Sequence, residues 1–364
     1  MNVCIIGEGL TALSLAKSLI NKKINVHYYY KSRNSNFSSN RTIGISKSNF
    51  EFFKEKIFQI SKNNYWKINR IEIYTDKIDT ENLLKFENDK NDLFYIIKND
   101  ELLKSLNSNL IKSKFFKKII LKKNINEEFL NKKEYDLIIN CDANNFLAKK
   151  YFTKKISKNY YNLAYTTILK HKKIENNTAT QIFTKQGPIA FLPISSTETS
   201  VVYSVDIKNK KFDNSDVIDL INKNNPKYKI NKIDKLNSFE LSSSNLRNYH
   251  HKNILAFGDM LHRVHPLAGQ GFNMTIRDLR ILTKIIEDKI ELGMQLDSQI
   301  LDEFEKKTKD KNFVFSKAID LIYESFNLDK KVQNKSFSKI IKNIGKNKNL
   351  NNYFIKLADV GINF

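Results

Sequence analysis

A glycine-rich turn near the start of the chain has the residue types that bind a phosphate. Residues 7–12 are GEGLTA, a G-x-G-x-x-A pattern. Gly7 permits a tight turn, Gly9 lets the backbone approach a pyrophosphate, and Ala12 is small enough for a following helix to pack on the preceding strand. Backbone N–H groups at the start of that helix would bind the phosphates. The pattern favours a dinucleotide site, although similar turns also join strands and helices in proteins that bind no nucleotide.

A second glycine-rich stretch lies far along the chain, where residues 258–273 are GDMLHRVHPLAGQGFN. Glycine and proline are scarce, with 10 and 4 in the whole chain. A glycine that is present is therefore expected to have a backbone reason, such as a positive φ or close approach to a ligand. Half of the glycines lie in these two stretches. The second stretch follows a predicted strand and precedes a predicted helix that runs to about Ile286.

The elements that position these turns follow from apolar spacing. Residues 2–7 and 24–30 predict buried strands, and the apolar residues of 10–20 recur at helical spacing, so the three segments form one βαβ unit. Residues 135–140 and 254–257 predict two more strands. Residues 158–245 alternate in the manner of antiparallel strands and predict a second domain built on a β-sheet. Asn- and Lys-rich stretches such as 31–40 and 207–235 are interpreted as loops or solvated faces.

Composition limits the class of protein. With 364 residues, 41% of them hydrophobic, the chain is long enough for two globular domains. Its net charge of +23 raises the question of nucleic-acid binding or of attraction to an anionic membrane. The lysines are spread along the chain instead of being clustered as a binding footprint requires. A compositional origin of the charge is therefore favoured, and no nucleic-acid partner is expected.

The two cysteines, Cys4 and Cys141, lie in apolar strands and are interpreted as buried free thiols. No apolar run approaches the roughly 20 residues that span a bilayer. The N-terminus opens directly into a strand without a signal peptide. We therefore expect a cytoplasmic protein, with peripheral attachment to the inner face of the membrane left as an alternative.

Residues 258–273 closely resemble a pattern of the aromatic-ring flavoprotein monooxygenases, G-D-A-A-H-x-x-x-P-x-x-G-Q-G-x-N. The resemblance implies that the chain binds FAD. It also implies that Asp259 binds the ribityl hydroxyls of FAD. The residues implied to line the flavin are Pro266, Gly269, Gln270, Gly271 and Asn273.

Within that family the chain is most similar to the ubiquinone-biosynthesis hydroxylases. His265 before the proline and the AGQG turn at 268–271 resemble theirs, as do RTIGIS at 41–46, Trp66 and GPIAFLP at 187–193. These pieces keep the same order over residues 1 to about 290. The resemblance implies an α/β fold of the p-hydroxybenzoate-hydroxylase type, with a Rossmann-type FAD-binding domain, an inserted β-sheet substrate domain and C-terminal helices. The implied bounds are 1–65, 93–157 and 246–330 for the FAD-binding domain, 66–92 and 158–245 for the substrate domain, and 331–364 for a C-terminal helical segment.

Departures from the family pattern concern the cofactor and its reduction. Tyr30 stands where a Glu or Asp is usual at the end of the second strand, and it is expected to reach the ribose only through its hydroxyl. Arg41 is expected to place a positive charge near the pyrophosphate. The family's middle motif, D-G-x-x-S-x-x-R, survives only as Asp142, with Lys149 keeping the charge. The electron donor therefore stays open between NAD(P)H and a separate reductase or ferredoxin.

The activity that the resemblance implies is hydroxylation of a prenylated phenol in ubiquinone biosynthesis, with O₂ and a flavin C4a-hydroperoxide. No catalytic base can be named. His262 and His265 are interpreted as hydrogen-bonded structural groups, and no metal site is expected. The resemblance also leaves room for contact with an anionic membrane or a quinone-biosynthesis complex. Two alternatives remain: a reductase or halogenase of the same fold, and a basic nucleic-acid-binding protein with a non-catalytic flavin fold.

Overall fold

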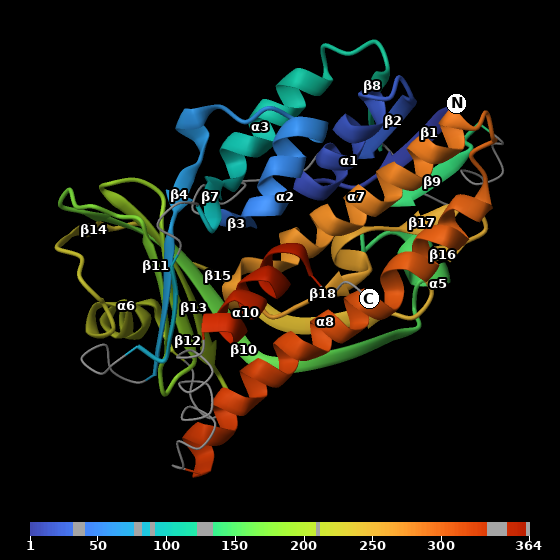
Figure 1. Ribbon diagram of the computed structural model, residues 1–364. Coiled ribbons are helices and arrows are strands. Elements are labelled where there is room, and N and C mark those ends of the chain that lie inside the picture. The colour runs from blue at the N-terminus through green and yellow to red at the C-terminus, as the bar shows by residue number, and fades with distance from the viewer. Residues whose placement is uncertain are drawn as a thin grey trace.

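The computed structural model describes residues 1–31, 41–75, 82–87, 92–121, 134–208, 212–332 and 348–361 (Figure 1). Two large sheets form the frame of this part of the chain, one mainly parallel and one mainly antiparallel. Figure 1 shows the parallel sheet with its helices at one end of the molecule and the antiparallel sheet at the other.

The N-terminal βαβ unit forms where the apolar pattern predicts it. Strand β1 (Asn2–Ile6) pairs in parallel with β2 (Asn25–Tyr30), and helix α1 (Leu10–Ile20) connects them. On its other side β1 pairs with β9 (Leu137–Asn140). The side chains from Val3 to Ile6 are at most 1% exposed, because a central parallel strand is covered on both faces.

The parallel sheet has the strand order β16-β17-β9-β1-β2-β8. Its other strands are β8 (Phe116–Ile120), β16 (His250–His251) and β17 (Ile254–Ala256). All neighbours pair in parallel except β16 with β17. Since β1, β9 and β17 are neighbours and parallel, the loops that follow them leave the same edge of the sheet. This sheet confirms the predicted Rossmann-type architecture.

Helices cover this sheet and provide most of the core around it. They are α2 (Lys47–Phe52), which continues as a π-helical turn (Phe53–Ile57), α3 (Asn99–Leu110), α5 (Phe146–Tyr151) and α7 (Gln270–Glu291). Helix α1 contacts both α3 and α7. Its Leu15 and Leu19 are fully buried, as are Leu106 of α3 and Leu282 of α7, all in one apolar cluster.

A small sheet connects the two ends of the molecule. Its order is β3-β7-β4, and its strands are β3 (Thr42–Ser46), β4 (Trp66–Ile68) and β7 (Phe94–Lys98). Helix α7 contacts β3. A short 3₁₀ turn (Lys62–Asn64) precedes β4, and the Trp66 indole N–H donates to the carbonyl of Asn176 on the antiparallel side.

The second large sheet has the order β18-β15-β10-β13-β12-β11-β5-β6, with β14 also paired to β10. Its strands are β5 (Arg70–Thr75), β6 (Leu84–Glu87), β10 (Lys155–His171), β11 (Thr178–Phe183), β12 (Pro188–Pro193), β13 (Glu198–Asp206), β14 (Ile230–Ile233), β15 (Asn237–Leu246) and β18 (His262–Arg263). Neighbours are antiparallel except β11 and β5. The antiparallel pattern expected over residues 158–245 is confirmed.

The stretch 207–235, interpreted from composition as loop or solvated face, contains helix α6 (Asn214–Lys223) and strand β14. Asp213 caps α6 by accepting from the backbone N–H of Asp216. Val217 and Ile221, four residues apart, are fully buried against the sheet. Of the other stretch, 31–40, residues 32–40 lie outside the described residues.

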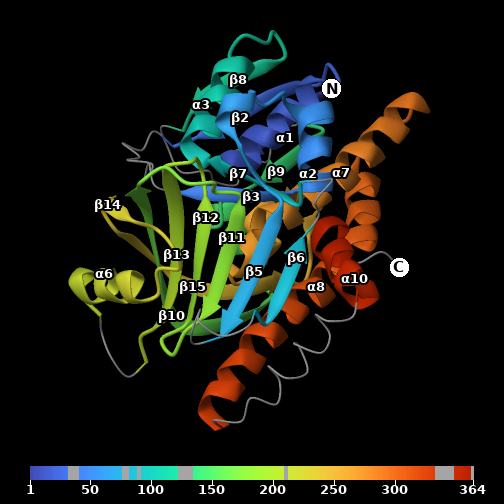
Figure 2. The same ribbon diagram turned by 60° about the vertical axis from the view of Figure 1, so that its left-hand side comes forward.

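Two helices end the described chain: α8 (Ser298–Val332) and α10 (Lys348–Val360). The Phe326 ring of α8 stacks on Phe183 of β11, with ring centroids 3.6 Å apart. Helix α10 contacts α2, and Figure 2 shows it alongside α8. None of the described helices is both long enough and apolar enough to cross a membrane.

The turn before β12 yields a prediction about folding. Gly187 has φ +143°, and a Cβ there would lie 1.9 Å from the carbonyl oxygen of Ser204. Gly187→Ala should lower the free energy of unfolding by more than about 2 kcal/mol, because both the positive φ and the backbone overlap must be relieved. Urea unfolding measures this. A variant as stable as the wild type would contradict the described approach of the two strands.

Candidate cofactor and substrate site

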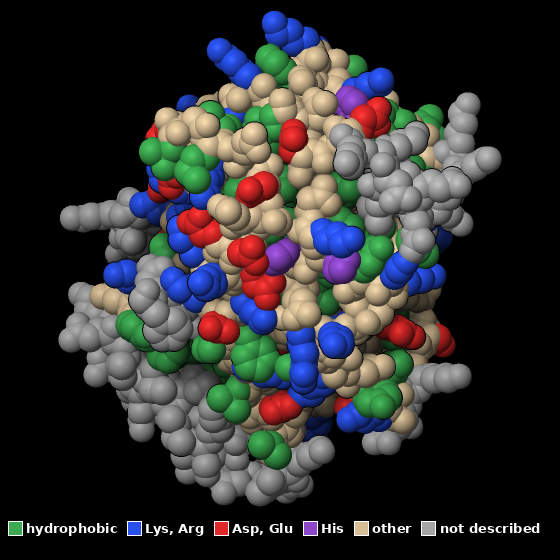
Figure 3. Space-filling view, turned by 90° about the vertical axis from the view of Figure 1, so that its right-hand side faces the viewer, with side chains coloured by type: hydrophobic (Ala, Val, Ile, Leu, Met, Phe, Trp, Pro, Cys, Tyr) green, Lys and Arg blue, Asp and Glu red, His purple; other side chains and the backbone are tan. Residues whose placement is uncertain are grey.

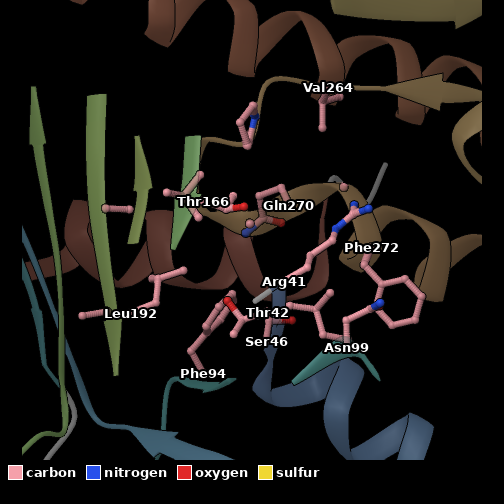
Figure 4. A pocket seen from close by; sticks show the side chains of 18 of the residues that line it. Arg41, Thr42, Ser46, Phe94, Asn99, Thr166, Leu192, Val264, Gln270 and Phe272 are labelled. Atoms are coloured by element: carbon pink, nitrogen blue, oxygen red, sulfur yellow. The ribbon is translucent and has the colours of Figure 1, made fainter. Parts of the chain in front are cut away.

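A cavity of about 1180 Å³ lies between the parallel sheet and the antiparallel sheet (Figure 4). Its walls come from both glycine-rich stretches, from the small sheet, from the antiparallel sheet and from α10. Pockets for a single drug-sized ligand have about 300–1,000 Å³. This cavity therefore has room for a large cofactor together with a substrate.

The first glycine turn forms one end of the cavity. Gly7 has φ +142°, and a Cβ there would lie 2.9 Å from the Cβ of Cys141. Gly9 has φ +103°, and a Cβ there would meet nothing within 4 Å. No side chain caps the N-terminus of α1, which follows at once. Its backbone N–H groups are therefore available to an anion.

The second stretch brings two more features to the same cavity. Gly258 begins a 3₁₀ turn (Gly258–Met260) with φ +70°, and a Cβ there would lie 2.5 Å from Cγ2 of Thr11. The two glycine turns are thus in contact, although about 250 residues separate them in sequence. Asp259, next in the turn, is exposed and lines the cavity.

The N-terminus of α7 also opens on the cavity. A short 3₁₀ turn (Leu267–Gly269) ends in the left-handed conformation at Gly269, with φ +62°, and α7 then begins without a side-chain cap. Pro266, Gly269, Gln270 and Gly271 all line the cavity. A Cβ at Gly271 would meet nothing within 4 Å. A 22-residue helix thus presents its N-terminal N–H groups to a ligand.

Arg41 contributes a cation from the opposite wall. It precedes β3 and is exposed toward the cavity. Figure 4 shows Arg41, Gln270 and Phe272 around the same space. A guanidinium at the same cavity as two helix N-termini suits a dianionic pyrophosphate better than any single one of these groups would.

Asn273 does not line the cavity but holds its walls together. It is fully buried. Its Oδ1 accepts from the backbone N–H of Ser46 at 2.9 Å, and its Nδ2 donates to the carbonyls of Gly44 at 3.0 Å and Gly269 at 3.1 Å. Asn273 therefore fixes β3 against the start of α7. Gly7 and Ala12 also lie outside the lining residues, and Ala12 is buried beneath the first turn.

Tyr30 and Asp142 are not among the cavity-lining residues. Tyr30 ends β2, where its ring stacks with Tyr28 and the Lys118 ammonium lies 4.5 Å from its centroid. Asp142 Oδ1 accepts from the backbone N–H of Asn144 at 2.8 Å, and Oδ2 lies 3.9 Å from Nζ of Lys31. Cys141 beside it does line the cavity. Cofactor contact by Tyr30 or Asp142 remains a prediction.

Sequence reasoning missed the contribution of α10. Ile355, Ala358 and Asp359 line the cavity. The Asp359 carboxylate accepts from the backbone N–H of Ser48 at 2.8 Å, and its carbonyl accepts from Ser46 Oγ at 3.1 Å. These contacts join positions more than 300 residues apart, and no local pattern in the sequence marks them.

The two histidines of the second stretch have separate protein partners. Nε2 of His262 lies 2.5 Å from Oδ2 of Asp278, and Asn312 donates to the other oxygen of that carboxylate at 2.9 Å. Nε2 of His265 lies 3.2 Å from Ser204 Oγ, and its ring stacks on Tyr323 with centroids 4.3 Å apart. Within the described residues no group of three or more His, Cys, Asp or Glu side chains is placed to bind a metal.

Comparison with known proteins also indicates a protein that binds FAD. A family model described as an FAD binding domain matches residues 159–311. The chain is 24% identical to the mitochondrial ubiquinone biosynthesis monooxygenase of Caenorhabditis elegans, over 80% of this chain and 78% of that protein. It is 29% identical to the 3-demethoxyubiquinol 3-hydroxylase of Escherichia coli, over 40% of this chain and 39% of that protein.

The chain is a homologue of the FAD-dependent monooxygenases. The zebrafish (Danio rerio) ubiquinone biosynthesis monooxygenase matches this homologue at 26% identity, but over only 47% of its own length. The share of a relative that the chain spans therefore varies from well under half to more than three quarters.

Solved structures show the same fold for this monooxygenase homologue. The p-nitrophenol 4-monooxygenase of Pseudomonas putida superposes with a TM-score of 0.77 at 12% identity, covering 99% of this chain and 98% of that one. Klebsiella pneumoniae HpxO, whose structure holds FAD and uric acid, gives 0.75 at 12% identity and covers 99% and 97%. The predicted p-hydroxybenzoate-hydroxylase-like fold class is thereby confirmed.

The side chains present fit FAD on structural grounds. Open space faces the two glycines, Gly9 and Gly271, at which backbone approach to a pyrophosphate is expected. Two uncapped helix N-termini and Arg41 suit the phosphates, and the Asp259 carboxylate suits ribityl hydroxyls as an acceptor.

Gly271→Ala separates ligand binding from folding. Because nothing lies within 4 Å of the added Cβ and alanine favours a helix, the free energy of unfolding of the FAD-free protein should stay unchanged or rise by up to about 1 kcal/mol. FAD affinity should fall at least about tenfold, because the methyl group enters the space that the cofactor backbone contact needs. Urea unfolding and FAD titration measure the two effects. Retention of wild-type FAD affinity would count against close approach at this residue.

Burial of His265 leads to a pH prediction. Burial, and then the nearby Lys158, lower the pKa of His265 to about 3, whereas the unfolded value is about 6.5. The unfolded chain thus binds the proton more readily, and stability is lost as pH falls from about 6.5 toward 3. Between pH 7 and pH 5 this one group should cost the wild type about 2 kcal/mol that His265→Phe does not lose. Equal losses in urea unfolding of both proteins would refute the assignment.

Proposed function

We propose that the chain binds FAD in the cavity and hydroxylates the aromatic ring of a prenylated phenol, a precursor of ubiquinone. The observation that supports this best is the meeting of the two glycine turns at one cavity that also borders an antiparallel sheet. The cofactor and the ring would then share one enclosed space. The names of the relatives, ubiquinone biosynthesis monooxygenase and 3-demethoxyubiquinol 3-hydroxylase, support the substrate class.

The role of each residue toward FAD is part of the proposal. Gly9 and the α1 N-terminus would bind the pyrophosphate together with Arg41, and Asp259 would accept from ribityl hydroxyls. Gln270 and Gly271, at the α7 N-terminus, would face the flavin and stabilise negative charge on it. Tyr30 and Asp142 would contribute from the edge of the site.

FAD, when bound and reduced, supplies the activation of O₂, one atom of which enters the ring while the other leaves as water. The protein's own part is to bind, orient and keep water out. On β5, β12 and β13 the residues that line the cavity are aliphatic: Ile71, Ile73, Ala190, Leu192 and Val202. A dry wall of this kind limits loss of reducing equivalents to solvent.

The reaction is tested with purified protein, FAD and isotopically labelled O₂. An ortho-farnesylphenol and its para-carboxylated counterpart are offered in parallel, first with NADPH alone and then with NADPH and a ferredoxin reductase system. We expect a product heavier by one labelled oxygen from at least one ring, and Asp259→Ala should lose that product together with bound FAD. Asp219→Ala, on the far side of the antiparallel sheet, serves as the matched control. Flavin-loaded protein that oxidises neither ring would refute the substrate class.

A peripheral membrane contact is proposed as part of this function. Val314, Leu321 and Leu328 recur every seven residues on the outer face of α8 and are 43%, 64% and 58% exposed. Such a stripe, on a chain of net charge +23, suits an anionic bilayer. On the face shown in Figure 3, Lys and Arg side chains are scattered among acidic and uncharged ones, which gives that face no continuous nucleic-acid footprint.

Vesicle flotation tests the membrane contact. The wild type should float with vesicles that contain anionic phospholipid, and the double substitution Leu321→Glu with Leu328→Glu should reduce the bound fraction several-fold, because it removes apolar burial and adds repulsion. The pair Lys232→Ala with Lys235→Ala, beside β14, lowers the net charge by the same two units and is the charge-matched control. Equal flotation of the two double variants would count against α8 as the contact.

A further inference from the structure

One row of side chains runs straight across the antiparallel sheet and faces the cavity. Thr166 of β10 is opposite Val202 of β13, Val202 is opposite Ala190 of β12, Ala190 is opposite Gln181 of β11, and Gln181 is opposite Ile73 of β5. All five line the cavity. Directly opposed residues share one face of a sheet, so the row forms a continuous strip of cavity wall.

Two of these five residues, Thr166 and Gln181, are polar, and neither side chain has a hydrogen-bond partner among the described residues. Asn237 of β15, opposite Thr166, also lines the cavity and adds a third polar side chain at the end of the row. Thr166 is 6% exposed, and Gln181 is half-buried. A polar group facing an otherwise apolar wall is stabilised by a partner, and a ligand in the cavity is in position to be one. The amide of Gln181 offers both a donor and an acceptor, and the hydroxyl of Thr166 offers the same.

The neighbouring row along the same face is apolar. Leu192, Ala179, Ile71 and Phe86 line the cavity there, and Ala179 is opposite Ile71, which is opposite Phe86. Among the described cavity-lining residues, those on β5, β6, β10, β11, β12 and β13 therefore carry no charge, and β15 beside β10 adds one carboxylate, Glu240.

The cations that do line the cavity lie on other elements. Arg41 precedes β3, and Lys47 begins α2. Arg263 is on β18, opposite Ser244 of β15. Ser244 is seven residues from Asn237, which is opposite Thr166, a separation of roughly 24 Å along the strand. A ring on the Thr166–Gln181 row thus meets no described lysine or arginine of its own wall.

We propose that this row selects an uncharged ring: a phenol without a carboxylate, bonded through its hydroxyl by Gln181, lying between Gln181 and Thr166 and resting on Val202 and Ala190. The inference rests on the proposed function and narrows its substrate. The backbones of Thr166 and Gln181 are three strand spacings apart, roughly 14 Å, so one ring fits between their side chains. A ring carboxylate would be desolvated there without a counter-charge, which is strongly unfavourable.

A matched pair of ligands tests the selection. Ortho-farnesylphenol and its para-carboxylated counterpart differ only in one carboxylate, and binding of each to the FAD-loaded protein is measured by equilibrium dialysis. The wild type should bind the phenol at least about a hundredfold more tightly. Equal or tighter binding of the carboxylated ring would overturn the inference and leave ring hydroxylation standing, whereas binding of neither ring would overturn both.

Substitutions at Gln181 test the assignment to this row. Gln181→Arg should reduce or reverse the preference for the phenol over its carboxylated counterpart. The added guanidinium should strengthen binding of the carboxylated ring at least about tenfold. Gln181→Met, similar in volume but without the amide, should weaken phenol binding about tenfold and leave the carboxylated ring no better bound. FAD content should match the wild type in both, which confirms folding. An unchanged preference in the folded Gln181→Arg protein would overturn the role of this residue.

Discussion

Close backbone approach at the carboxyl edge of the parallel sheet is the constraint on which the cavity depends. The loops after β1, β9 and β17 meet there, with Gly7 against Cys141 and Gly258 against Thr11. A Cβ at either glycine would lie within 3 Å of a neighbouring side-chain atom, closer than packed atoms come. The absence of two side chains therefore lets three distant segments converge, and the α1 N-terminus and Asp259 come to face one space.

A second set of contacts attaches the remaining walls to this edge. Asn273 forms hydrogen bonds with the backbone of β3 and with that of the turn before α7. Asp359, on α10, forms hydrogen bonds with β3 and with the start of α2. These are buried or partly buried polar contacts, and their geometry specifies which surfaces meet. The antiparallel sheet then closes the cavity, and its lining residues on β5, β6, β10, β11, β12 and β13 are uncharged. Cofactor chemistry and substrate choice are thus assigned to different sheets.

Much of the fold could be predicted because its signals are local. The buried run of β1, the helical spacing of α1 and the turn before α7 each occupy a short stretch of sequence, and glycine is rare enough in this chain to mark the turns. Helix α6 was missed because its apolar residues, Val217, Ile218, Leu220 and Ile221, form a short run within an Asn- and Lys-rich stretch. Neither α10 as a cavity wall nor the Thr166–Gln181 row could be found, since both arise from strand register or from contacts between distant segments.

The central claim is that the cavity binds FAD. Titration of FAD into flavin-free protein, followed by calorimetry and by quenching of flavin fluorescence, tests it most directly. Saturation is expected at one FAD per chain, with a yellow complex that survives gel filtration. Folded protein, verified by its circular dichroism, that takes up no FAD would contradict the account.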